Sequence, residues 1–174
     1  MEMLAPRWSD AYASRGEDPS LALSPMRVPV PPINEAFIGR FRHTIDAKGR
    51  LTLPAKLRGP LASGVVVTRG SDRCLFLFTA ERWEELRERV RNLPLGEPRA
   101  VRLRRHLFAY AEGLIPDRQG RILISQDLRE WAGLGNEVLI VGQDTHLEIW
   151  DSHTWDERQQ SDRLTTEDWA ALGI

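Results

Sequence analysis

The sequence of 174 residues is poor in several kinds of residue, and each shortage excludes a class of protein. A single cysteine, Cys74, excludes an internal disulfide framework and any zinc site that needs two or more thiolates. No run of 18 apolar residues occurs, so a transmembrane helix and a membrane partner are not expected. Charged residues interrupt the first 24 positions, which argues against a secretory signal. We therefore expect a protein of the cytoplasm.

Signatures of catalysis and of cofactor binding are also missing. His146 and His153 lie seven positions apart without an HExxH frame, and neither a Walker A motif nor a glycine-rich phosphate loop occurs. Cys74 lies in an apolar run, which is typical of an inert core thiol rather than a nucleophile, and His43 is expected to be a packed or surface side chain. The sequence predicts no enzyme: no catalytic residue, no metal, no cofactor and no small-molecule substrate.

Charge is plentiful but unevenly distributed. The total of 24 basic and 25 acidic residues gives a net charge of -1. Phe37–Arg58 nevertheless holds six basic residues and one acid, and Arg82–Arg105 holds eight basic residues and four acids. Asp144–Ile174 reverses the balance, with two basic residues and eight acids. Such asymmetry favours a polyanionic partner, although a charged run is more often a solvated face.

From Phe37 onward the chain contains an internal duplication. Asp46–Arg58 aligns with Asp117–Arg129 at an offset of 71, and five of the thirteen positions are identical. A one-residue insertion then changes the offset to 72 and pairs Trp83 with Trp155. A match over a whole structural unit indicates two tandem copies of one supersecondary element.

Each copy has the pattern of a hairpin, a short helix, a second hairpin and a longer helix. The tight turn of the first hairpin is predicted from an aspartate, which can bond the backbone ahead of it, and a glycine, which tolerates positive φ. These turn-forming residues are Asp46 and Gly49 in the first unit and Asp117 and Gly120 in the second. Two short hairpins do not bury a core alone. We therefore expect an α+β, mainly β fold in which the two units interleave into one small β-barrel with short flanking helices.

The same patterns predict the domain boundaries. Residues 1–36 contain six prolines without a usable period and are predicted to be a disordered extension, with Met26 as an alternative start. The first unit is expected over residues 40–87, a linker and basic helix over 88–110, the second unit over 111–154, and an acidic C-terminal helix or tail over 155–174. The arginines of Arg99–Arg105 indicate a solvated helix face, or alternatively an oligomer interface or a phosphate contact.

Basic side chains surround the first turn, which makes it the candidate DNA-binding element. They are Arg40, Arg42, Lys48, Arg50, Lys56 and Arg58. Such side chains on a rigid hairpin can contact phosphates, and arginine can read guanine in the major groove. The alternative is that aspartate and arginine merely close the turn. The second turn contributes Arg121 among as many acids as arginines, so we expect the first unit to dominate the binding of double-stranded DNA.

A resemblance extends this interpretation. The segments Phe37–Gly39, His43–Arg58, Asp117–Ile124, Val141–Gln143 and Glu148–Asp151 resemble the MraZ family in order and spacing. The resemblance implies two SpoVT-AbrB-like units in a swapped-hairpin, double-psi-like β-barrel. It also implies a nucleoid-associated, ring-shaped homo-oligomer that binds direct repeats in the promoter of a division and cell-wall gene cluster, including its own gene. Bound over that promoter, the assembly is expected to block polymerase and so to repress these genes. The family's Asp-x-x-x-Arg motif falls on Asp46–Arg50 and Asp117–Arg121, and its DNA-binding arginine on Arg50.

Two other functions remain open at this point. The first is an AbrB-like antitoxin, whose extension or acidic tail would neutralise a toxin. The second is a non-specific nucleoid-associated protein that uses the same basic residues without reading sequence. Preference for promoter DNA over scrambled DNA separates both alternatives from a sequence-specific transcription factor.

Overall fold

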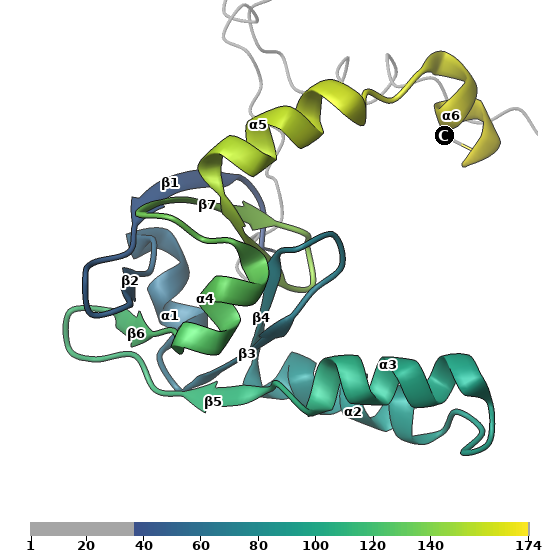
Figure 1. Cartoon of the computed structure of the whole chain (residues 1–174), viewed down its shortest axis with the longest axis horizontal. Coiled ribbons are helices and arrows are strands. Elements are labelled where there is room, and N and C mark those ends of the chain that lie inside the picture. Colours follow the sequence, from purple (N-terminus) through teal and green to yellow (C-terminus); the bar gives the residue numbers. More distant parts are fainter. Residues whose placement is uncertain (1–36, 174) are drawn as a thin grey trace, which may run out of the picture. The chain divides into compact units, whose positions relative to one another are not determined.

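The computed structural model describes residues 37–173, and the predicted extension over 1–36 lies outside them. The first half runs in the order β1 (Arg40–Thr44), β2 (Arg50–Thr52), the 3-10 turn η3 (Ala55–Leu57), α1 (Arg58–Leu61), β3 (Val65–Arg69), β4 (Leu75–Thr79) and α2 (Ala80–Arg91). The second half follows as α3 (Pro98–Phe108), β5 (Glu112–Leu114), β6 (Arg121–Leu123), α4 (Gln126–Ala132), β7 (Glu137–Gly142), β8 (Leu147–Asp151), α5 (Ser152–Ser161) and α6 (Thr166–Ala171). This succession confirms the predicted α+β class (Figure 1).

The strands form a six-stranded antiparallel sheet and a separate two-stranded ribbon. The order in the sheet is β1-β7-β8-β4-β3-β5, and β2 pairs with β6 in the ribbon. The first strand of each unit pairs with the third strand of the other, so that Arg40 lies opposite Val141 in β1–β7 and Val65 lies opposite Leu114 in β3–β5. The two halves of the chain therefore depend on each other for their sheet neighbours.

The prediction of a closed barrel is wrong in one respect, because the sheet is open. Its order ends at β1 on one side and β5 on the other. After the first turn, β2 hydrogen bonds along β6 rather than back along β1. The two sides of that hairpin are joined only next to the turn, by the isolated bridge between Ile45 and Leu51 and by the bond from the Asp46 N–H to the Arg50 carbonyl. Because β2 and β6 form a separate ribbon, the hydrogen bonding between strands is not continuous around the core, as it would be in a barrel.

The main core fills the space between the sheet and the ribbon. Leu51 and Ile122 point inward from the ribbon and are 0% and 1% exposed. They pack in one cluster with sheet residues such as Val67 and Ile140, and with α4 through Leu128. The inward face of the ribbon is therefore fixed by burial, and its outward face is left to solvent.

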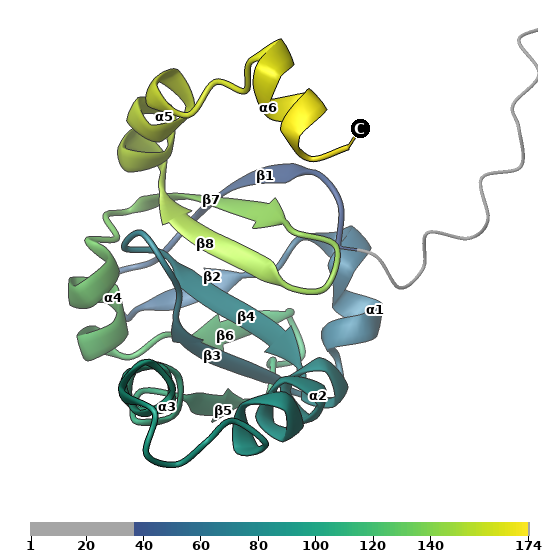
Figure 2. The same cartoon turned by 90° about the vertical axis from the view of Figure 1, so that its right-hand side faces the viewer.

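The helices cover opposite ends of the sheet. In two views, α5 and α6 lie beyond the β1 and β7 side, whereas α2 and α3 lie beyond the β3 and β5 side (Figures 1 and 2). A second cluster beneath α5 contains Cys74, Trp150 and Trp155. The predicted burial of Cys74 is confirmed: its thiol donates to the Ser71 carbonyl, and burial raises its pKa far above the usual range. A protonated, enclosed thiol is a poor nucleophile.

Candidate nucleic-acid interface

The first turn is held together by the side chain of Asp46. Its Oδ1 accepts from the backbone N–H of Lys48 at 3.0 Å and of Arg50 at 2.9 Å, while Oδ2 accepts from Arg50 Nε at 2.6 Å. Gly49 has φ +84°, and a Cβ there would lie 2.9 Å from the Ile124 carbonyl oxygen. Aspartate and glycine are thus required by the geometry of the turn, and Arg50 is fixed at its exit.

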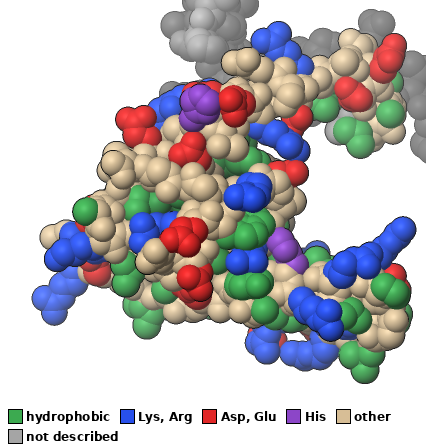
Figure 3. Space-filling view, in the orientation of Figure 1, with side chains coloured by type: hydrophobic (Ala, Val, Ile, Leu, Met, Phe, Trp, Pro, Cys, Tyr) green, Lys and Arg blue, Asp and Glu red, His purple; other side chains and the backbone are tan. Residues whose placement is uncertain are grey.

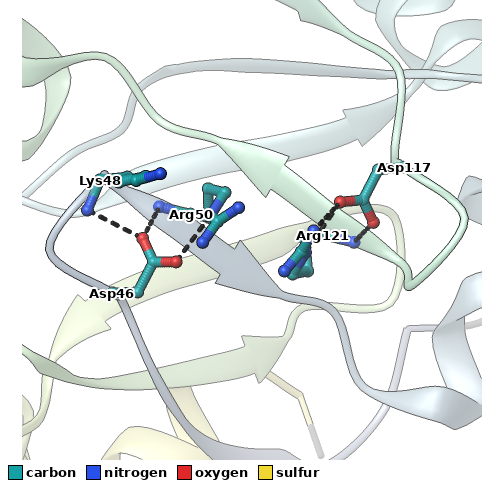
Figure 4. A network of polar contacts seen from close by, with 5 residues as sticks. All are labelled: Asp46, Lys48, Arg50, Asp117 and Arg121. Atoms are coloured by element: carbon teal, nitrogen blue, oxygen red, sulfur yellow. Dashed lines mark hydrogen bonds and ion pairs between the residues drawn. The ribbon is translucent and has the colours of Figure 1, made fainter.

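The second turn repeats these bonds. Asp117 Oδ1 accepts from the N–H groups of Gln119 at 2.9 Å and Arg121 at 3.0 Å. Its Oδ2 accepts from Arg121 Nε at 2.8 Å and also lies 2.7 Å from Nη2 of the same guanidinium (Figure 4). In both turns, therefore, the arginine Nε donates to the second carboxylate oxygen of the aspartate four residues before it.

Both aspartates are stabilised as carboxylates. The pKa of Asp46 is lowered first by the hydrogen bond from the Arg50 backbone N–H, and that of Asp117 first by the bond from the Arg121 side chain. Hydrogen bonding to the charged form favours that form. Each carboxylate is consequently ionised at neutral pH and orients its arginine before any ligand arrives.

The pairing register then sets the outward face of the ribbon. Arg50 lies opposite Leu123, and Thr52 lies opposite Arg121. Because Leu51 and Ile122 between them are buried, the alternation of a strand turns these four side chains to the other face. Leu123 is 56% exposed. We name this surface, made of Arg50, Thr52, Arg121 and Leu123, the ribbon face.

A second pair of arginines connects the two turns crosswise. Arg58 Nε donates to the Leu53 carbonyl at 3.0 Å, and its side chain covers Gly120 of the second turn. Arg129 Nε donates to the Ile124 carbonyl at 3.2 Å and covers Gly49 of the first turn. Arg58 and Arg129 occupy equivalent positions in the two units. Once the role of Arg58 is known, the duplication therefore predicts the same role for Arg129. Each arginine supports the turn of the opposite unit.

The remaining predicted residues are more dispersed. Lys48 is exposed at the tip of the first turn, and Lys56 is exposed on η3. Arg40 and Arg42 are exposed on β1, where Arg42 Nη2 lies 3.4 Å from Asp156 of α5. Sequence reasoning missed Arg118, an exposed residue in the second turn, because the acids of that unit obscured it. The structure thus gathers Lys48, Arg50 and Arg121 around the ribbon and turns Arg42 toward α5.

Residues 37–173 contain neither a candidate cluster of metal ligands nor a candidate membrane-spanning helix. No group of three or more histidine, cysteine or acidic side chains in that range is placed to hold a metal ion. Across the same residues, none of the helices has the length and apolar character needed to cross a bilayer. The basic ribbon is the feature that calls for a functional explanation.

These observations define a class of protein: a tandem-repeat α+β protein with two Asp-x-x-Gly-Arg turns beside one ribbon. Comparison with known proteins identifies the family. The model of the family described as "MraZ protein, putative antitoxin-like" matches residues 36–106 and again 107–171. The chain belongs to the MraZ family.

Relatives from several bacteria carry the name transcriptional regulator MraZ. The protein of Roseiflexus castenholzii is 50% identical over 119 residues, which cover 68% of this chain and 83% of the relative. The protein of Herpetosiphon aurantiacus is 44% identical over 119 residues, with the same coverage. That of Acetivibrio thermocellus is 39% identical over 142 residues, covering 79% of this chain and 99% of the relative. The family is one of transcriptional regulators and not of enzymes.

Proposed function

We propose that the chain is a sequence-specific transcriptional regulator that binds double-stranded DNA through the ribbon face. The observation that carries the proposal is the outward placement of Arg50, Thr52 and Arg121 on a two-stranded antiparallel ribbon. The major groove admits such a ribbon, and arginine and threonine side chains can read base edges there. Lys48 and Arg118, which are exposed in the two turns, would contact the flanking phosphates.

The Asp–Arg bond prepares Arg50 for this role. Its Nε is held by Asp46 at 2.6 Å, which fixes the plane of the guanidinium while the terminal nitrogens extend beyond the bond. A side chain oriented in advance loses less conformational freedom when it binds. The Arg121 side chain is 28% exposed, against 36% for Arg50. This difference supports the prediction that the first unit dominates DNA binding.

One chain offers few contacts, so affinity is expected to come from assembly. In a ring-shaped homo-oligomer, ribbon faces at fixed spacing would engage direct repeats in a promoter together, and effective concentration would supply the affinity. Such an assembly would repress the division and cell-wall gene cluster that includes its own gene, and it would act in the cytoplasm at the nucleoid. β1 of the first unit pairs with β7 of the second, and β5 of the second pairs with β3 of the first. This exchange of strands between the units supports swapped-hairpin SpoVT-AbrB-like units.

The test is a titration of the full chain with labelled DNA from upstream of its own gene, beside scrambled DNA of equal length. We expect selective binding that weakens steeply with salt, because lysine and arginine displace condensed cations from the phosphates. Selectivity is expected to be lost in Arg50→Ala and only partly restored in Arg50→Lys, which keeps the charge without the planar fork. Equal affinity for both DNAs would instead indicate a non-specific nucleoid-associated protein.

The family description favours one other function, that of an antitoxin. In that case the product of a neighbouring gene would arrest growth, and co-expression of this chain would relieve the arrest. An Arg50→Ala variant separates the two functions. If the variant still relieves the arrest but no longer binds the promoter, a protein surface other than the ribbon face neutralises the toxin.

A further inference from the structure

Two helical arms of this chain expose apolar side chains that a stable surface would normally cover. The basic arm consists of residues 80–108, with α2 and α3, and exposes Leu95 at 83% and Phe108 at 36%. The acidic arm consists of residues 152–173, with α5 and α6, and exposes Trp169 at 46% and Leu172 at 68%. Large exposed apolar side chains that gather on one surface mark an interaction site.

A groove runs between α2 and α3 on the basic arm. It encloses about 430 Å³ and combines apolar walls with guanidinium groups. Its lining residues are Trp83, Arg87, Arg91, Leu95, Arg104 and Phe108. The Trp83 and Phe108 rings meet edge to face at 5.7 Å, and Arg104 donates to the Val90 carbonyl at 3.2 Å, which ties α3 to the end of α2. The groove is thus a built feature of the helix pair.

The acidic arm ends in a short helix, α6, which is capped at its start but whose residues are exposed. Thr165 and Asp168 form a reciprocal capping box that starts α6. Trp169 and Leu172 follow three residues apart, which places them on one side of the helix. Every residue from Ser161 to Gly173 is exposed. A helix of six residues is marginal in water without tertiary contacts, so a partner surface would stabilise α6.

The two arms are complementary in charge. Residues 80–108 contain eight arginines and five acids, a net +3, whereas residues 152–173 contain two arginines and five acids, a net -3. Figure 3 shows basic and hydrophobic side chains together over α2 and α3, and acidic and hydrophobic ones together over α6. Glu167 and Asp168 precede Trp169 directly, so the carboxylates and the indole belong to the same segment.

We propose that the acidic arm of one copy docks in the α2–α3 groove of a second copy. Trp169 and Leu172 would fill the apolar part of the groove beside Leu95, and Glu167 and Asp168 would face Arg87 and Arg91. The arms lie beyond opposite sides of the sheet within one copy, so a second copy is the natural occupant (Figures 1 and 2). The inference rests on the proposed function, in which the chain acts as an oligomer, and identifies the surface that builds it.

The contact is head-to-tail, which determines the type of assembly. Each copy offers one groove and one acidic arm, and the two are different surfaces. A heterologous contact of this kind produces a closed ring when its rotation closes. The ribbon lies apart from both arms, between β1 and β5 in Figure 2, so assembly leaves the ribbon face open to DNA.

The first measurement is the mass of the full chain by sedimentation velocity without DNA. We expect Leu95→Glu, in the groove, and Trp169→Ala, on the acidic arm, each to weaken self-association by about 30-fold or more, the effect of truncating a buried aromatic anchor. The control is Ile115→Glu, an 80% exposed apolar residue outside both arms, which should leave the mass unchanged. Unchanged thermal midpoints show that the variants fold.

Mixing the two defective variants tests whether the acidic arm of one copy binds in the groove of the other. The Leu95→Glu copy retains its acidic arm and the Trp169→Ala copy retains its groove. A mixture should therefore form a heterodimer of twice 19.9 kDa and grow no further. Three results would overturn the proposal. They are assembly that persists in either single variant, a mixture that forms no heterodimer, and assembly that is lost when residues 1–35 are deleted. A ring that fails to select promoter DNA would overturn the proposed function and leave this interface standing.

Discussion

The turn at Asp46–Arg50 and the turn at Asp117–Arg121 share one framework but present different side chains to solvent. In both, one carboxylate oxygen accepts two backbone N–H groups and the other accepts from the arginine. The outer positions differ: Lys48 aligns with Gln119, and Thr52 aligns with Leu123. The framework residues are fixed by backbone geometry, whereas the outer residues are free to vary with the ligand.

This comparison separates structural roles from binding roles. Asp46 and Asp117 close the turns, and Arg58 and Arg129 cover the glycines of the opposite turns. None of these four needs DNA to account for its position. Lys48 and the outward fork of Arg50 have no such internal explanation. Substitution of Lys48 should therefore change binding without changing stability, whereas substitution of Arg50 also removes its contact with Asp46.

The largest effect is expected from Gly49→Ala. Gly49 has φ +84°, and its new Cβ would lie 2.9 Å from the Ile124 carbonyl oxygen, a backbone atom that cannot move aside. We expect the free energy of unfolding to fall by about 2–4 kcal/mol, from the left-handed backbone and the steric contact together. Urea denaturation measures this change.

Gly120→Ala sharpens the comparison of the two turns. Its φ is +72°, but the atoms in the way belong to the flexible Arg58 side chain, which can rotate. The loss should therefore be smaller, about 1–2 kcal/mol. If Gly120→Ala proves the more damaging change, Arg58 is held more firmly than its single hydrogen bond to Leu53 indicates.

The next effect concerns DNA affinity. Arg50→Ala should weaken promoter binding by about 100-fold, because it removes a base-reading side chain whose contact contributes about 1–3 kcal/mol in each bound copy. Arg121→Ala should weaken it by about 10-fold or less, because Arg121 is less exposed than Arg50 and the second turn has Gln119 in the place of Lys48. Fluorescence anisotropy at fixed salt measures both. Equal losses of affinity in the two variants would show that both units contribute equally to DNA binding.

The elements of each unit could be predicted from sequence because they depend on local chemistry. Aspartate and glycine at fixed offsets specify the two turns, and the alternation of Phe41 and His43 with arginines specifies β1, whose outward residues are exposed as expected. The duplication then transfers these assignments from one unit to the other. Local signals of this kind survive because the tertiary structure agrees with them.

Contacts between the units could not be predicted in the same way. Whether β2 returns along β1 or pairs with β6 depends on the register between halves, so the closed barrel was a wrong prediction. Arg58 counts among the DNA-binding candidates by proximity in sequence, yet its Nε donates to the Leu53 carbonyl and its side chain covers Gly120. Arg42 likewise approaches Asp156, 114 residues away. Its candidate role in DNA binding, like that of Arg58, stays a prediction.

A smaller effect is expected on salt dependence. Lys48→Gln should reduce the slope of log K against log salt by about one for each bound copy, because one phosphate contact is lost. Gln119→Lys makes the reverse exchange in the second turn. A steeper slope in that variant would show that the second turn also reaches phosphate, and an unchanged slope would confine phosphate contact to the first.

The smallest effect concerns pH. The folded-state pKa values of Asp46 and Asp117 are lowered, so both carboxylates add stability above their unfolded values, near pH 4, and that stability is lost as pH falls through the folded pKa. Thermal midpoints between pH 6 and pH 3 should therefore fall less steeply in Asp46→Asn than in the wild type. Asp168→Asn tests the C-terminal helix in the same way, because Thr165 lowers the pKa of Asp168 in α6, outside the ribbon. A larger flattening in Asp168→Asn than in Asp46→Asn would place the main acid-sensitive step in the C-terminal helix rather than in the turns.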